Sequence, residues 1–175
     1  VSSEKQRCGR FVVYHNFKKE YGHNEYPLDS LRLSATASSN NDHAHRMIDD
    51  DMSTFWRTDR LQEEGMKVEI SFENARLISR LLLYFGDSHH DRPAKYQVAI
   101  SNHGVWRPAS HSTMHKPDKF AFENNHPRYG KPLLQTILLE PAIADGIRII
   151  IEEPARQWAW TLNEIKVFAR SDPAE

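Results

Sequence analysis

The sequence predicts an all-β fold, an antiparallel β-sandwich, and three observations support this prediction. Short runs in which apolar and polar residues alternate recur along the 175-residue chain, and this period of two is typical of half-buried strands. Sustained helical periodicity is almost absent, so the strands must pair with one another without intervening helices. Eight Phe, six Tyr and four Trp supply large core side chains and exclude a disordered chain.

Seven strands are expected, with turn-forming residues between them. They cover residues 31–37, 67–72, 77–85, 95–101, 133–139, 146–151 and 163–168. The run 77–85 is mostly apolar, which indicates a more deeply buried strand. Glu73-Asn74 and Asp145-Gly146 are typical turn residues and are expected to separate neighbouring strands.

The length fits one domain, which we place at residues 30–170. Residues 1–29 are expected to form an N-terminal extension that either packs on the sandwich or belongs to a linker. Residues 107–132 hold Pro, His and several basic side chains without alternation. This segment is therefore predicted to be a loop insertion, and long loops in compact domains tend to be functional.

Composition excludes several classes of protein. The formal net charge of −1 provides no basic excess to neutralise phosphates, so a nucleic-acid partner is not expected. No apolar run approaches the ~20 residues of a membrane helix, so membrane insertion is not expected either. A single cysteine, Cys8, excludes an internal disulfide and a multi-cysteine zinc site. This cysteine count fits the cytosol and a disulfide-free secreted or periplasmic module equally well.

The run Asp49-Asp50-Asp51 is the most informative local signal in the chain. Three consecutive carboxylates repel one another, so a folded chain tolerates them only where they are solvated or neutralised. Ca²⁺ is a natural neutraliser, because it takes about six to eight oxygen ligands and often mixes carboxylates with backbone carbonyls. The residues that follow do not have the spacing of an EF-hand. The alternative is an exposed acidic turn without a bound ion.

Four motifs taken together resemble the discoidin family. They are residues 48–56 with the pattern Ile-Asp-x-Asp-x-x-Thr-x-Trp, the strand 78–85, the segment 95–106 ending in Ser-Asn-His-Gly-Val-Trp, and the closing run 162–168. This family has the coagulation-factor type C, or galactose-binding-domain-like, fold and includes the family 32 carbohydrate-binding modules. The motifs follow the family's order between about residues 30 and 169, with His103 in the usual place of Asp.

The resemblance implies an eight-stranded, jelly-roll-like sandwich with one structural Ca²⁺. The implied ligands are the carboxylates of Asp49, Asp51 and Glu164, the hydroxyl or carbonyl of Thr54, and the backbone carbonyl of Met47. The family usually has Gly where this chain has Asp50, and Asp tolerates a positive φ better than most residues, so the turn is expected to be kept. Trp56 is expected to lie in the core below this loop.

The resemblance also places a sugar site on loops at one end of the sandwich. A sugar site combines an aromatic face with planar polar side chains for the hydroxyl groups. The loops 87–93 and 155–160 have this chemistry and correspond to the binding loops of the carbohydrate-binding relatives, which hold galactose-type sugars. The candidate residues are His89, His90, Arg92, Arg156 and Trp158, with Arg57 and Asp59 at the same rim. The alternative is that the histidines are merely solvated and that the neighbouring Trp160 is buried.

The sequence offers little for catalysis or for a transition metal. It contains no Gly-x-Ser-x-Gly, no phosphate-binding glycine loop and no His-Glu-x-x-His. His43 with His45, His89 with His90 and His111 with His115 each lack a third ligand at a diagnostic distance. The chain is therefore not expected to be an enzyme.

The leading hypothesis is a non-catalytic carbohydrate-binding module that binds a glycan, with galactose-type sugars as the first guess. We expect it in a larger extracellular or periplasmic protein of bacterial type, beside an enzyme or membrane-protein domain of the same chain. The alternative is an adaptor-like discoidin module that binds a protein and has no sugar site. Polar residues in the loop 87–93 disfavour the lipid-binding relatives, which display apolar spikes there.

Overall fold

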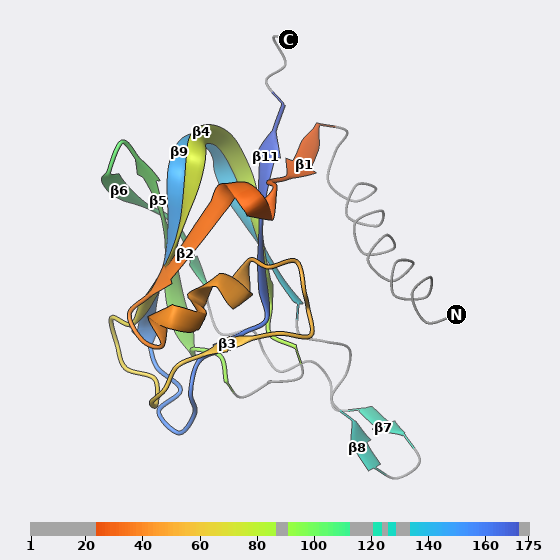
Figure 1. The fold of residues 1–175 in the computed structure, drawn as a ribbon. Helices are drawn as coiled ribbons and strands as arrows, with labels where there is room; N and C mark the ends of the chain where they lie inside the picture. Colours follow the sequence, from red (N-terminus) through yellow and green to blue (C-terminus); the bar gives the residue numbers. More distant parts are fainter. Residues whose placement is uncertain (1–23, 87–90, 113–120, 124–125, 129–133, 172–175) are drawn as a thin grey trace.

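The fold is an antiparallel β-sandwich, as the sequence predicts (Figure 1). The computed structural model describes residues 24–86, 91–112, 121–123, 126–128 and 134–171. Its elements are β1 (Glu25–Pro27), the 3-10 helix η1 (Ser30–Arg32), β2 (Leu33–Ala37), the 3-10 helix η2 (Asn41–Met47), β3 (Trp56–Arg57), β4 (Lys67–Tyr84), β5 (Lys95–Asn102), β6 (Val105–Ser112), β7 (Ala121–Glu123), β8 (His126–Arg128), β9 (Leu134–Glu153), β10 (Thr161–Leu162) and β11 (Glu164–Arg170). No helix in these ranges is both long and apolar enough to cross a bilayer.

Seven of the strands form one curved sheet. Its order is β1-β11-β4-β9-β5-β6, with β2 paired to β4, and every pair is antiparallel. β10 pairs with β3, and β7 pairs with β8, as two small additional sheets. The large sheet therefore has to fold over itself to enclose a core.

The two longest strands, β4 and β9, curve so that the sheet folds over itself. The sequence prediction was wrong about them, because it divided each into two strands. The predicted strands 67–72 and 77–85 are one strand, β4, whose pairing with β9 is irregular between Ser71 and Arg76 and again between Ile78 and Arg80. The predicted strands 133–139 and 146–151 are likewise one strand, β9. The turn-forming residues bend each strand without reversing it, because an irregularity in the ladder increases the local twist and curvature. Figure 1 shows β4 and β9 curving together from one layer into the other.

The expected boundaries also change in three places. Residues 105–112 are strand β6, so the first part of the predicted insertion 107–132 belongs to the sheet. Residues 25–27 of the predicted N-terminal extension form β1 and pair with β11. Residues 31 and 32 lie in η1 and not in a strand. The remaining residues of the extension, 1–23, lie outside the described ranges.

The core at the η2 end is built around two tryptophans. Trp56 and Trp160 are each 1% exposed, and their rings meet edge to face with centroids 5.3 Å apart. Such an arrangement places the positive ring edge against the negative face. The indole N–H of Trp56 lies 3.2 Å from the Ser39 carbonyl and 3.1 Å from the Asn40 carbonyl. Trp56 is thus a core residue, as predicted, and it holds the start of η2 against the sandwich.

One outward face of the sheet carries a charged ladder. Glu69 on β4 accepts a hydrogen bond from Arg148 Nε on β9 at 2.8 Å and lies 2.7 Å from the Lys67 ammonium. The Arg148 guanidinium also covers the Trp106 ring at 3.9 Å. Partial burial raises the pKa of Glu69, but the Lys67 hydrogen bond and the Arg148 charge outweigh it and leave that pKa below its usual value.

Candidate functional site

The loop of residues 47–54, called the acidic loop below, separates its three carboxylates by local hydrogen bonds. Asp49 accepts from the Asp51 backbone N–H at 3.0 Å and from the Thr54 hydroxyl at 2.8 Å. Asp51 accepts from the Ser53 backbone N–H at 2.9 Å and from its hydroxyl at 2.6 Å. These are the self-capped turns that Asp residues form readily. Two of the three carboxylates thus stabilise the loop itself.

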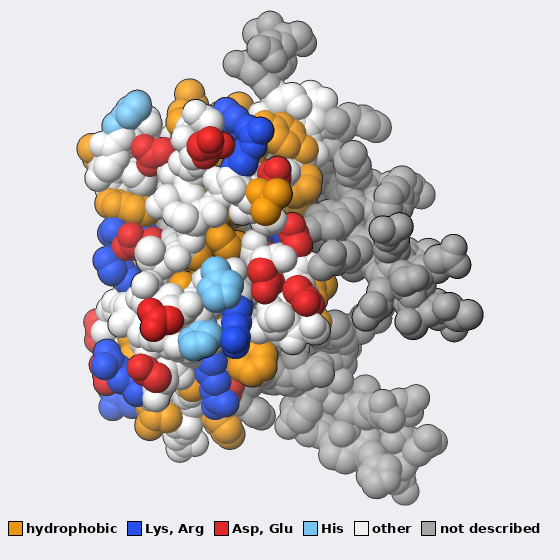
Figure 2. Space-filling view, in the orientation of Figure 1, with side chains coloured by type: hydrophobic (Ala, Val, Ile, Leu, Met, Phe, Trp, Pro, Cys, Tyr) orange, Lys and Arg blue, Asp and Glu red, His pale blue; other side chains and the backbone are white. Residues whose placement is uncertain are grey.

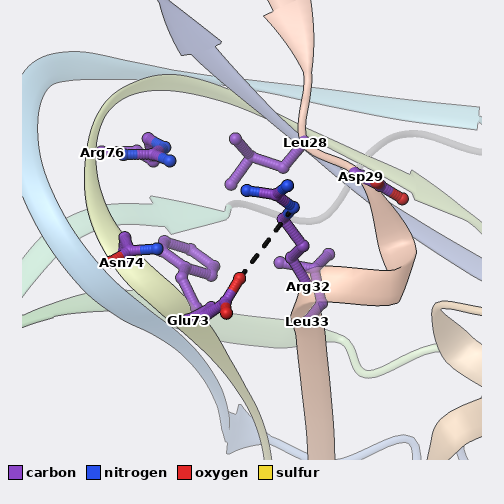
Figure 3. Close-up of a pocket in the computed structure, with 8 residues that line it drawn as sticks. Leu28, Asp29, Arg32, Leu33, Glu73, Asn74 and Arg76 are labelled. Carbon is purple, nitrogen blue, oxygen red and sulfur yellow. Dashed lines mark ion pairs between the residues drawn. The ribbon is translucent and has the colours of Figure 1, made fainter.

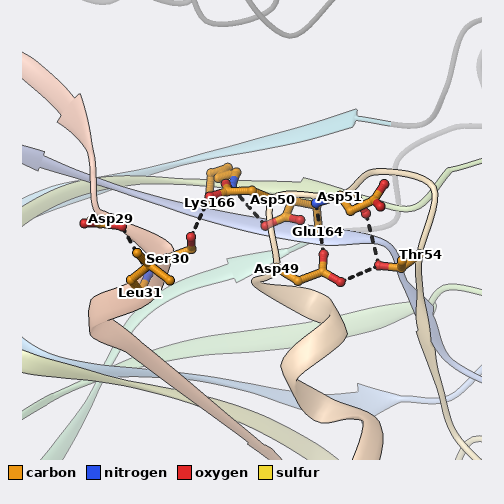
Figure 4. A network of polar contacts seen from close by, with 9 residues as sticks. All are labelled: Asp29, Ser30, Leu31, Asp49, Asp50, Asp51, Thr54, Glu164 and Lys166. Atoms are coloured by element: carbon orange, nitrogen blue, oxygen red, sulfur yellow. Dashed lines mark hydrogen bonds and ion pairs between the residues drawn. The ribbon is translucent and has the colours of Figure 1, made fainter. Parts of the chain in front are cut away.

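Asp50 turns away from its two neighbours toward β11. Its φ of 64° lies in the left-handed region, which confirms that Asp can take the place of the family's usual Gly here. One carboxylate oxygen accepts from the Ser30 hydroxyl at 2.5 Å, and the other contacts the Lys166 ammonium. Figure 4 shows the Asp50 carboxylate directed toward Lys166, while Asp49 is directed toward Thr54.

Glu164 and Lys166 face the acidic loop from the last strand. They are two residues apart on β11, so their side chains leave the same face of the sheet. The Glu164 side chain is 1% exposed and the Lys166 side chain 7% exposed, and Lys166 Nζ lies 3.1 Å from Glu164 Oε1. The carboxylate of Glu164, which the resemblance implies as a calcium ligand, is thus part of a buried ion pair with Lys166.

Three of the predicted calcium ligands, Asp49, Asp51 and Glu164, have partners within the chain itself. Within the described ranges, no three His, Cys, Asp or Glu side chains come close enough to hold a metal ion. Asp49 and Asp51 cap their own loop, and the positive charge beside Glu164 comes from Lys166. Met47 is fully buried at the end of η2. Calcium binding therefore stays a prediction, and the structure adds a lysine that the predicted ligand set did not include.

A second cluster forms where two loops meet at the β3 end of the sandwich (Figure 1). Backbone hydrogen bonds join residues 55–62 to residues 155–160, from Thr58 N to the Trp160 carbonyl at 2.9 Å and from Gln62 N to the Trp158 carbonyl at 3.0 Å. The buried Gln62 side chain reaches across the same junction to two further backbone groups of the second loop. The two loops are therefore held in one fixed arrangement.

A third segment is fixed to these two by Asp91. Its carboxylate accepts from the Thr161 hydroxyl at 2.8 Å and lies 3.6 Å from the Arg57 guanidinium, while its carbonyl accepts from Thr161 N at 2.9 Å. Because Arg57 is paired with Thr161 in the β3–β10 register, one carboxylate connects three separate parts of the chain. Gln62, Asp91 and Thr161 were not among the predicted site residues, since their role depends on contacts far apart in sequence.

Trp158 presents an aromatic side chain to solvent at this end. It is 42% exposed, whereas the nearby Ala159 and Trp160 are buried. Its backbone N–H donates to the Ala155 carbonyl at 2.9 Å, which closes a tight turn at the loop tip. The alternative that Trp160 is a core residue is thus correct, and Trp158 keeps the solvent exposure that a platform for a ligand requires.

The other predicted binding residues divide into three groups. Arg57 and Arg156 are exposed, and Arg92 is half-buried. Asp59 is exposed and accepts from the Ser39 hydroxyl at 2.5 Å. His89 and His90 lie outside the described residues. On the face shown in Figure 2, acidic and basic side chains are interspersed.

A small cavity of about 30 Å³ lies at the bend of β4, at the other end of the sandwich. Leu28 and Phe72 form its apolar wall, and Arg32 and Glu73 at its rim are 3.9 Å apart (Figure 3). It has room for about one water molecule. None of the predicted site residues lines it.

Comparison with solved structures identifies the fold among carbohydrate-binding modules. The family 32 module of NanJ from Clostridium perfringens, solved with galactose, has a TM-score of 0.62 and 17% identity over 82% of this chain and 98% of that one. CpGH89CBM32-5 from the same organism, solved with GalNAc-β-1,3-galactose, has a TM-score of 0.64 and 19% identity over 82% and 100%. Chitosan-binding module 2 of a Paenibacillus sp. IK-5 chitosanase/glucanase, solved with chitotriose, has a TM-score of 0.59 and 16% identity over 78% and 95%.

These identities are low, so the structural matches establish the fold and not the ligand. Among curated proteins, no sequence matches the chain. The model of the family described as F5/8 type C domain matches residues 34–165, which is most of the chain and includes all four motifs except residues 166–168 of the last one. The chain therefore belongs to the F5/8 type C, or discoidin, family.

Proposed function

We propose that the chain is a non-catalytic carbohydrate-binding module whose glycan site is the β3 end of the sandwich. The observation that carries the proposal is the exposed Trp158 ring, which stands on a loop held by backbone hydrogen bonds to residues 55–62. An aromatic ring held in place covers the C–H face of a pyranose at little entropic cost. Arg57, Arg92 and Arg156 belong to the segments that are joined at this end, and their guanidinium groups would be planar hydrogen-bond donors for the sugar hydroxyls.

Galactose-type sugars are the first ligands to test, because two of the similar structures hold galactose or a galactose-containing disaccharide. We also propose that the module belongs to a larger extracellular or periplasmic protein with an enzyme or membrane-protein domain in the same chain. The Paenibacillus module, which derives from a chitosanase/glucanase, supports such an arrangement.

The test is a glycan array followed by titration of the purified chain, compared with Trp158→Ala. The variant should bind the best sugar at least about tenfold more weakly, because a stacking aromatic contributes more than 1.4 kcal/mol at such a site. Its melting temperature should fall only slightly, since the side chain is 42% exposed and is not one of the buried core residues. Val105→Ala is the matched control, because Val105 is exposed at the β5–β6 turn, at the other end of the sandwich. Equal binding by wild type and Trp158→Ala would contradict the proposed site.

A protein-binding adaptor module is the second candidate, and one observation favours it. Phe55 and Leu61 are also exposed, at 47% and 54%, in the loop joined to that of Trp158. Exposed apolar side chains that gather at one end are typical of protein contacts. A wild-type chain that binds no sugar on the array would contradict the glycan proposal and favour this one.

A further inference from the structure

The acidic loop meets a positive charge that belongs to the chain itself. Lys166 Nζ lies 3.1 Å from Glu164 Oε1 and also contacts Asp50 Oδ1. These three charged groups come from two distant segments of the chain, since Lys166 and Asp50 are 116 positions apart. Figure 4 shows the ammonium between the strand carboxylate and the loop carboxylate.

The burial of these groups makes the lysine a requirement of the fold. Glu164 is 1% exposed and Lys166 is 7% exposed, so neither charge is solvated by bulk water. An isolated buried carboxylate is strongly unfavourable unless an opposite charge lies beside it. An ammonium group has three donors and a compact charge, which suits contact with two carboxylates at once.

The conformation of Asp50 supports the same conclusion. Its left-handed φ of 64° brings its carboxylate to Lys166 and away from Asp49 and Asp51. The Ser30 hydroxyl donates to the second oxygen of that carboxylate at 2.5 Å. A glycine at this position would keep the turn but would remove one carboxylate from the lysine.

We propose that Lys166 is the resident cation of the acidic loop, so that the fold does not depend on Ca²⁺. The ammonium neutralises Glu164 and Asp50, and a divalent cation bound to Glu164 would have to lie beside a like charge. Such an ion binds there only when Lys166 is displaced or removed. This inference is independent of the proposed glycan site. It concerns the contact of the acidic loop with β11 and the stability of the sandwich, and not the loop that carries Trp158.

The first experiment compares the melting temperature of the wild-type chain in EDTA and in millimolar CaCl₂. A ligand that binds only the folded state at about 100 times its Kd raises the melting temperature by about 5–10 °C for a chain of this size. We expect a shift below about 2 °C. A larger shift would overturn the proposal, because it would show that the wild-type loop takes the ion despite its lysine.

The second experiment uses Lys166→Met, which keeps the length of the side chain and removes its charge. This variant should melt lower than wild type in EDTA and should gain more than about 2 °C from CaCl₂, because the two carboxylates then lack their cation. Lys67→Met is the matched control, since Lys67 is paired to Glu69 on an exposed ladder, and it should show no calcium response. A Lys166→Met variant that folds and responds to calcium no more than wild type would overturn the proposal.

If Lys166→Met folds in neither buffer, Lys166→Met/Glu164→Gln decides the question. The double variant removes both buried charges, so it should fold and melt without a calcium response. A double variant that also fails to fold would overturn the proposal, because the loss would then not come from an unneutralised Glu164.

Discussion

Gln62 holds Ala159 across the junction of the loops 55–62 and 155–160, although the two residues are 97 positions apart. Its Nε2 donates to the Ala159 carbonyl at 2.9 Å, and its Oε1 accepts from Ala155 N at 3.0 Å. One buried amide thus satisfies two backbone groups on either side of Trp158. The position of the exposed ring depends on this clamp and not on its own loop alone.

Gln62→Leu should destabilise the chain and loosen the loop that carries Trp158. The substitution leaves two backbone groups without their partner, at a cost of about 2–4 kcal/mol in the free energy of unfolding. For a chain of this size the melting temperature should fall by about 5–15 °C, as thermal unfolding measures. Gln157→Leu is the matched control, because Gln157 is exposed in the same loop. Equal melting of the two variants would show that the clamp is not stabilising.

Glu25→Gln should be strongly destabilising because Arg80 is buried beside it. The Arg80 side chain is 1% exposed, lies 3.1 Å from Glu25 Oε2 and covers the Phe168 ring at 3.9 Å. Removing one partner of a buried pair costs about 3–5 kcal/mol, which denaturant unfolding can measure. Glu73→Gln should change little, since that carboxylate forms an exposed pair with Arg32.

The double variant Glu25→Gln/Arg80→Met tests the cause of this loss. It removes both charges, so it should be more stable than Glu25→Gln alone, as expected when the loss comes from an uncompensated guanidinium. If the double variant is instead less stable than Glu25→Gln, the pair contributes through packing and not through charge.

Glu69 should make the stability of the sheet depend on acid pH. Its folded-state pKa lies below the ordinary value of 4.5, because the stabilising Lys67 and Arg148 contacts outweigh the opposing effect of burial. A carboxyl group with a lowered folded pKa contributes stability above its unfolded pKa, and this contribution is lost as the pH falls through the folded value. The difference in melting temperature between wild type and Glu69→Gln should therefore be largest above about pH 5 and should shrink toward pH 3. The exposed Glu140→Gln is the control, and a difference that stays constant with pH would contradict the assignment.

Local features were the ones that the sequence predicted well. Asp50 adopts a positive φ of 64°, in the turn that the resemblance implied. The pairing of Asn102 with Val105 shows a short hairpin around His103, whose φ is 52°. The choice between a turn and a bend at Glu73 was beyond local patterns, because both use the same residues and only the pairing with β9 distinguishes them.

In the candidate site, too, local features could be predicted from the sequence, whereas features that depend on distant contacts could not. The sequence predicted Trp158 and three arginines, but it could not tell whether Trp158 or Trp160 is exposed, since both stand in one short loop. Packing against Trp56 decides this, with the Trp160 ring buried at 5.3 Å from its partner. Gln62, Asp91 and Thr161 carry no local signal, because each acts on groups about 70 or more positions away.

The sequence by itself determined the fold class, the family and the presence of a carboxylate run that must be solvated or neutralised. Strand period, turn residues and a consecutive triplet of Asp are local properties, so they can be read along the chain. Only the tertiary structure decided which cation lies beside Glu164 and which part of the run it contacts. Lys166 reaches Asp50 because β11 and the acidic loop pack together, and the charges of a run cannot be assigned to partners before their distances are known.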